Sequence, residues 1–110
     1  MQKKETFGEV VRKLREERKL PIRKVAAKLD IDPSTLSKIE RGERSANKEH
    51  ISEFAKIFEI EEKELLIHFF SDKVTYDLIN EDYTDEILMV AEEKIKYQKS
   101  KKIQQGRLKL

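Results

Sequence analysis

Residues suited to specific hydrogen bonding are concentrated in one short stretch of the chain, "DIDPSTLSKIERGERS", at positions 30–45. Hydroxyl side chains both donate and accept hydrogen bonds, and an ammonium group donates three. A hydrolytic serine would also need an activating base and an elbow such as Gly-x-Ser-x-Gly, and the chain has no such motif. We therefore expect a binding surface and no enzyme activity. Its candidate residues are Ser34, Thr35, Ser37 and Lys38.

Metal, disulfide and nucleotide sites are not indicated by the sequence. The chain has no cysteine, and its two histidines, His50 and His68, are eighteen positions apart without a matching carboxylate pattern. The three glycines are scattered, so they form no phosphate-binding loop. We expect no metal, no cofactor and no small-molecule effector.

Size and composition indicate one compact domain with an appended element. The chain has 110 residues, of which 42% are charged, yet apolar residues recur at helical spacing almost throughout. The first residues lack the apolar run of a signal peptide, and no segment approaches the roughly eighteen apolar residues that cross a bilayer. We expect a soluble, cytoplasmic protein that does not enter a membrane.

Charge is strongly segregated along the chain. Residues 1–58 hold 15 Lys/Arg against 10 Asp/Glu, residues 59–93 hold 2 against 12, and residues 94–110 hold 7 against none. A basic first half suits a polyanionic partner, and the alternative is solvated helix faces of differing sign.

Breaks in the apolar periodicity divide the first 70 residues into five short helices. Pro21 and Pro33 are tolerated at helix starts, and Asp32 and Asn47 are expected to cap helices with their side chains. Gly42 offers the left-handed conformation that ends a helix. The five helices are expected at about residues 6–18, 22–29, 33–41, 47–58 and from 61 onward.

The last third of the chain is less clear. The segment "SDKVTYDLINEDY" fits helix or strand by period, and we favour helix with a break near Asn80. Thr84 is expected to cap a last helix, about residues 85–105, whose narrow apolar stripe suits pairing with another helix. From Lys99 onward the chain has little to bury, and we expect a frayed, mobile tail.

Two of the expected helices, 22–29 and 33–41, are joined by a short turn at "LDID" and carry small or apolar residues where they would meet. This arrangement is typical of a helix-turn-helix, whose second helix lies in the major groove of DNA. Short or flexible donors and acceptors on that helix can approach base edges, and residues 34–38 meet this requirement.

The stretch "KLPIRKVAAKLDIDPSTLSKIERGER" resembles the lambda-repressor-like (Cro-type, XRE) helix-turn-helix family, over about residues 7–66. The resemblance implies an all-α fold, with a five-helix DNA-binding domain at residues 1–70 and a C-terminal helical dimerisation extension at residues 71–110. Asp30 stands where the family usually has glycine, but aspartate tolerates a left-handed backbone. The small size also resembles controllers of restriction-modification genes.

Carried over position by position, the resemblance implies how DNA bases are read. A guanine is expected opposite Lys38, because lysine can donate to its O6 and N7 atoms. The family also pairs an arginine of helix one with a glutamate of helix three, which matches Arg15 and Glu40. The base-contacting positions are Pro33, Ser34 and Lys38, with Thr35 and Ser37 close by.

Phosphate contacts are expected from basic residues around the second helix of the motif. Ile22 stands where the family often has a glutamine that reaches a phosphate, so that contact would pass to Arg23 or to a backbone N–H. Arg41, Arg44 and Lys48 follow the helix and would hold the DNA backbone. A solvated helix end is the alternative for the two arginines.

The apolar residues of the last third exceed what a finished five-helix domain requires. One domain reads one half-site, so we expect a two-fold homodimer on an inverted repeat. An antitoxin-like protein whose C-terminal third binds another protein is the alternative, and the basic tail could touch DNA or neutralise the acidic middle. The expected interface residues are Phe69, Phe70, Val74, Leu78, Ile79, Ile87, Leu88, Ala91 and Ile95.

Overall fold

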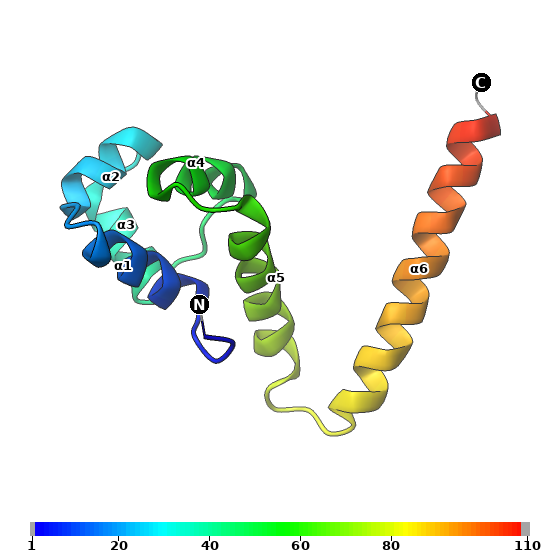
Figure 1. The fold of residues 1–110 in the computed structure, drawn as a ribbon. Coiled ribbons are helices and arrows are strands. Elements are labelled where there is room, and N and C mark those ends of the chain that lie inside the picture. The colour runs from blue at the N-terminus through cyan, green and yellow to red at the C-terminus, as the bar shows by residue number, and fades with distance from the viewer. Residues whose placement is uncertain (1, 109–110) are drawn as a thin grey trace. The chain divides into compact units, whose positions relative to one another are not determined.

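The computed structural model describes the backbone of residues 2–108 and the side chains of residues 2–102. The described residues form α-helices and no strands, so the expected all-α fold is confirmed. The contacts divide the chain into an N-terminal unit that ends at Tyr76 and a C-terminal unit that begins at Asp77. The helices are α1 (Phe7–Glu17), α2 (Ile22–Leu29), α3 (Pro33–Glu40), α4 (Lys48–Phe58), α5 (Glu62–Leu78) and α6 (Thr84–Leu108) (Figure 1).

Local signals set the ends of the first helices. The Thr6 hydroxyl accepts the N–H of Glu9 at 3.1 Å and caps α1. Asp30 ends α2 in the left-handed conformation, with φ 56° and ψ 44°, and Gly42 follows α3 with φ 74°. Both left-handed positions agree with the sequence expectation.

The side-chain caps expected at Asp32 and Asn47 are wrong, although each residue occupies the cap position with an extended backbone. At α3, Pro33 occupies the first helical position, and the backbone carbonyl of Asp32 accepts the N–H of Leu36 at 3.1 Å. At α4 the backbone carbonyl of Asn47 accepts the N–H of His50 at 3.0 Å, and this bond replaces the one from the side chain.

The core of the N-terminal unit is built from α1 to α4 and the first half of α5. Its largest fully buried side chains include Leu36, Ile51, Phe54 and Phe58. The ring of Phe7 meets that of Phe54 edge-on, with centroids 5.9 Å apart. Apolar faces spaced at the helical period are therefore buried against one another, as the sequence pattern predicts.

Phe69 belongs to this core, so its assignment to a dimer interface is wrong. Its side chain is 4% exposed and its ring lies edge-on to Phe7, with centroids 5.6 Å apart. Two neighbours also bind α5 to the start of α1. The Asp72 carboxylate accepts the N–H of Phe7 at 2.8 Å, and Nδ1 of His68 lies 3.2 Å from the carbonyl oxygen of Glu5.

These contacts explain why the N-terminal unit extends to Tyr76, whereas we expected a boundary after residue 70. The helix favoured for the ambiguous segment is confirmed, because α5 continues without interruption to Leu78. The break expected near Asn80 lies between Leu78 and Thr84, where Tyr83 has a φ of 65°.

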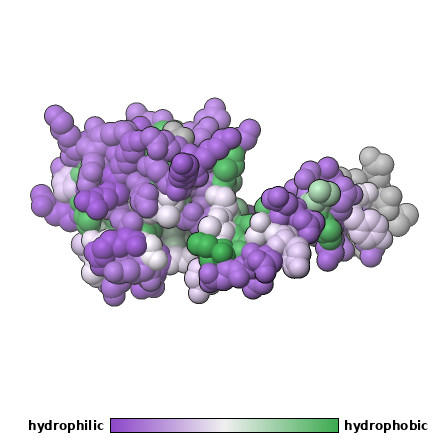
Figure 2. All heavy atoms as spheres, turned by 90° about the horizontal axis from the view of Figure 1, so that it is seen from below, coloured by the Kyte–Doolittle hydropathy of each residue, from purple (hydrophilic) through white to green (hydrophobic). Residues whose placement is uncertain are grey.

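The C-terminal unit consists of the last two residues of α5, a turn and α6. The fraying expected from Lys99 is wrong as far as Leu108, because lysine, glutamine and arginine are good helix formers and sustain the helix there. Exposed apolar side chains occur along α6 and on α5, among hydrophilic ones (Figure 2). No helix within residues 2–108 is long and apolar enough to span a membrane.

Candidate nucleic-acid interface

Helix α3 is held by one face and presents the other to solvent. Leu36, Ile39 and Glu40 are buried, and α3 packs against both α1 and α2 (Figure 1). The exposed side carries Ser34 and Lys38, which are four positions apart and therefore share a face of the helix. The polar row predicted from the sequence is thus accessible along one side of α3.

The five predicted base-contacting residues differ in exposure. Pro33, Ser34 and Lys38 are exposed, whereas Thr35 and Ser37 are half-buried at the edges of the exposed face. The three exposed side chains therefore project farthest from α3, and Thr35 and Ser37 lie at the edges of the face that they form.

The turn before α3 is closed by backbone hydrogen bonds. The N–H of Ile31 donates to the carbonyl of Ala26 at 3.0 Å, and the N–H of Asp30 donates to that of Ala27 at 3.2 Å. Ala26 is fully buried, and its small side chain permits the close packing of α2 with α3. The tight turn thereby fixes the angle at which α3 leaves α2.

A two-armed ion pair joins α3 to α1. Nε of Arg15 donates to Glu40 at 2.7 Å, and a second guanidinium nitrogen donates to the other carboxylate oxygen at 3.0 Å. Arg15 also donates to the carbonyl of Leu20 at 3.0 Å. The hydrogen bond to Glu40 raises the pKa of the Arg15 guanidinium above its ordinary value. The structure thus brings together the two residues expected to pair, and the parallel bonds fix the orientation of α3.

Gly8 allows α1 and α3 to approach closely, which sequence reasoning missed. A Cβ atom at this position would lie 2.6 Å from the carbonyl oxygen of Glu40 and closer still to that of Ile39. A single glycine within a helical pattern is a signal of such packing, and "FGEVV" contains one.

The residues expected to contact phosphates are all exposed, but one of them is already engaged. Arg23, Arg44 and Lys48 are exposed, whereas a guanidinium nitrogen of Arg41 donates to Glu43 at 3.0 Å. That hydrogen bond raises the pKa of Arg41 and lowers the pKa of the Glu43 carboxyl. Glu43 therefore already occupies one face of the Arg41 guanidinium in the single chain, and the sequence offered no clear sign of this pair.

A polar hollow of about 430 Å³ lies beside the turn between α2 and α3. Thr35 of α3 and Arg44 of the following loop both line it, so α3 and the loop after it meet there. Asp30 and Asp32 line it as well, which places two carboxylates beside the arginine. The local charge is therefore mixed, and Lys38 is a more favourable contact for a polyanion than the hollow itself.

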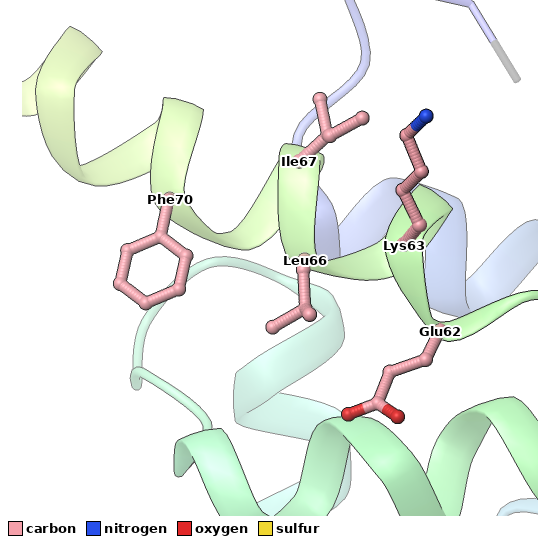
Figure 3. Close-up of a pocket in the computed structure, with 5 residues that line it drawn as sticks. All are labelled: Glu62, Lys63, Leu66, Ile67 and Phe70. Atoms are coloured by element: carbon pink, nitrogen blue, oxygen red, sulfur yellow. The ribbon is translucent and has the colours of Figure 1, made fainter. Parts of the chain in front are cut away.

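A second, apolar hollow of about 600 Å³ lies along α5. Leu66 and Phe70 project to one side of the helix, while Ile67 and Lys63 project to another (Figure 3). The remaining residues expected at a dimer interface are exposed or half-buried in the single chain. Exposed are Phe70, Val74, Ile79, Ile87, Leu88 and Ile95, and half-buried are Leu78 and Ala91.

Comparison with known proteins assigns the chain to a family. A helix-turn-helix family model matches residues 11–65, from within α1 to the first turn of α5. No curated protein and no solved structure gives a significant match. The matched half of the chain contains α2, the closed turn and α3, whose geometry agrees with the family's motif. The chain therefore belongs to the XRE-type, lambda-repressor-like helix-turn-helix family of DNA-binding regulators.

Proposed function

We propose that the protein is a transcriptional regulator that binds a specific double-stranded DNA sequence, with α3 in the major groove. The observation that carries the proposal is the exposed row of Ser34 and Lys38 on a helix whose opposite face is anchored by the Arg15–Glu40 ion pair. Base reading requires side chains on a rigid support, because small displacements break hydrogen bonds to base edges.

Lys38 carries most of the base discrimination in this proposal. Its ammonium group donates to O6 and N7 of guanine, while Ser34 both donates and accepts and therefore tolerates several bases. We expect a guanine opposite Lys38 and looser reading opposite Ser34.

Phosphate contacts would set the position of the domain on the duplex. Arg23 lies in the first turn of α2, and Lys48 is the first residue of α4, so each stands at a helix N-terminus whose N–H groups also favour an anion. Arg44 and Arg41 follow α3. Such contacts carry no sequence information but dominate affinity and its salt dependence.

A homodimer on an inverted repeat completes the proposal. A single domain of this type reads one half-site, which is too short for selectivity, and a two-fold dimer reads two half-sites about one helical turn apart. The exposed apolar residues of α5 and α6 supply surface for association of two chains.

Selection of bound sites from a random DNA pool at near-physiological salt tests this function. The full chain is expected to recover an inverted repeat, and Lys38→Ala is expected to relax the choice at the guanine by about 1–3 kcal/mol. Lys56→Ala removes an exposed lysine from α4 and serves as the control, with the motif retained. Recovery of the same motif by Lys38→Ala would refute base reading by Lys38. Recovery of no motif by the full chain would refute specific DNA binding.

Glu43→Gln is expected to increase DNA affinity several-fold. The substitution removes the carboxylate that holds Arg41 at 3.0 Å and frees the guanidinium for a phosphate. One additional phosphate contact would steepen the slope of log affinity against log salt by about 0.9. Fluorescence anisotropy over a salt series measures both quantities. Glu9→Gln, an equal charge change on exposed α1, controls for net charge, and an unchanged slope in Glu43→Gln would show that Arg41 makes no such contact.

A further inference from the structure

Helix α6 is divided into two blocks of opposite charge. Residues 84–93 contain four acidic and no basic side chains, and residues 94–102 contain five lysines and no acidic side chain. One ion pair, Glu92 to Lys96 at 3.0 Å, joins the blocks at their boundary. The other charged side chains of the described part of the helix are exposed. The helix therefore presents a reversal of charge along its length.

An exposed apolar face lies across the boundary between these blocks. Ile87, Leu88 and Ile95 are 39%, 46% and 53% exposed in the single chain, and their spacing places them on one side of the helix around Ala91. Met89 and Val90 are also exposed, so apolar surface surrounds the acidic block more widely than the narrow stripe expected from the sequence. A helix with this much apolar surface is stabilised by covering it.

We propose that α6 of one chain pairs antiparallel with α6 of a second copy, about a two-fold axis near Ala91. With the axis near Ala91, the antiparallel orientation places Asp85 and Glu86 of each helix beside Lys96 and Lys99 of the other, while Glu92 and Glu93 of both helices lie near the axis. A parallel pair would instead align acid with acid and lysine with lysine. The inference rests on the homodimer proposed above and adds its surface and its orientation.

A second copy is the occupant that the charges favour. One helix carries both complementary blocks, so the same helix in the reverse direction supplies both partners at once, as an isologous contact requires. A uniformly acidic or basic partner helix would leave one block facing like charge. Packed helices lie about 8–10 Å apart, which is close to the screening length of about 8 Å at physiological salt. The preference for the antiparallel orientation should therefore weaken as salt is raised.

The absence of cysteine from the chain permits a direct test of orientation. Thr84, Ala91 and Gln98 are seven positions apart and share the face of α6 that is proposed to pair. Thr84→Cys and Gln98→Cys therefore place thiols at the two ends of this face, separated along one helix by about 21 Å. The full-length variants are treated, singly and mixed, with a bismaleimide whose span is less than half that distance.

Antiparallel pairing predicts cross-linked dimers in the mixed sample and none in either variant alone. Mixing gives at most half of the dimers one chain of each variant, so at most half can be cross-linked. Ser100→Cys, mixed with Thr84→Cys, is the matched control, because residue 100 lies on the opposite side of the helix and should give several-fold less product. Circular dichroism verifies that each variant remains helical.

Cross-linking of Thr84→Cys alone would show a parallel pair and overturn the proposed orientation. Absence of any product, together with a monomer in sedimentation, would overturn the pairing itself. Site selection with the unmodified chain shows whether only the α6 pairing fails or the DNA-binding function fails as well. If an inverted repeat is recovered while the pairing or its orientation is overturned, the regulator proposal stands. If the chain is a monomer that selects no motif, both proposals fail, and a different protein becomes the expected partner.

Discussion

Replacement of Gly8 by alanine is expected to destabilise the N-terminal unit by about 3 kcal/mol, near the upper end of the usual cost of overpacking. The new methyl group would overlap the carbonyl oxygens of Ile39 and Glu40, which belong to the backbone of α3 and cannot rotate away. Relief requires α1 and α3 to separate. The midpoint of urea unfolding, monitored by circular dichroism, measures the loss.

The same substitution should reduce DNA affinity in the fraction that remains folded, because α3 would shift relative to α1. Two control substitutions distinguish the loss of stability caused by overlap with α3 from the loss that any substitution at a glycine or an exposed position would cause. Gly42→Ala meets no atom within 4 Å but must adopt a φ of 74°, so it should cost about 1–2 kcal/mol through strain alone. Glu9→Ala, at the exposed neighbouring position, should have little effect. Equal stability of Gly8→Ala and the unmodified protein would contradict the close approach of the helices.

Arg15→Met is expected to destabilise the unit by about 3–5 kcal/mol, because it leaves the Glu40 carboxylate buried without a partner. The side chains of Arg15 and Glu40 are 12% and 4% exposed, so water can replace little of the lost interaction. A unit of this size has a stability of about 4–11 kcal/mol, and a loss of this magnitude would leave a substantial unfolded fraction on moderate warming. Urea unfolding and the thermal midpoint both measure it.

The double variant Arg15→Met with Glu40→Leu tests whether the pair contributes orientation more than stability. Replacement of both members by apolar side chains is expected to recover most of the lost stability. DNA affinity should recover less, since the two parallel hydrogen bonds that orient α3 are gone. Arg12→Met breaks the exposed pair with Glu16, whose side chains are 61% and 54% exposed, and should leave stability almost unchanged. Similar losses in Arg12→Met and Arg15→Met would show that burial of the pair does not matter.

Features that depend on neighbours along the chain could be predicted from the amino-acid sequence. The helices of the N-terminal unit follow from the apolar period and from breaks at Pro21, Pro33 and Gly42, because dihedral restrictions act within one or two residues. The left-handed Asp30 was expected from the resemblance, because the family usually has glycine at this position and aspartate tolerates that backbone. The pairing of Arg15 with Glu40 was expected from the resemblance of the motif and not from spacing, since the two residues are 25 positions apart.

Which surface covers each apolar or polar group depends on how the helices pack, and it could not be predicted from the sequence. Phe69 and Phe70 are adjacent and similar in type, yet Phe69 is buried against Phe7 while Phe70 remains exposed. Periodicity identifies apolar positions but not the element that packs on them. The contact of Gly8 with α3 and the capping of α1 by Asp72 likewise join residues distant in sequence. Such contacts arise when helices pack, because packing selects partners by shape and distance in space, neither of which local residue patterns encode.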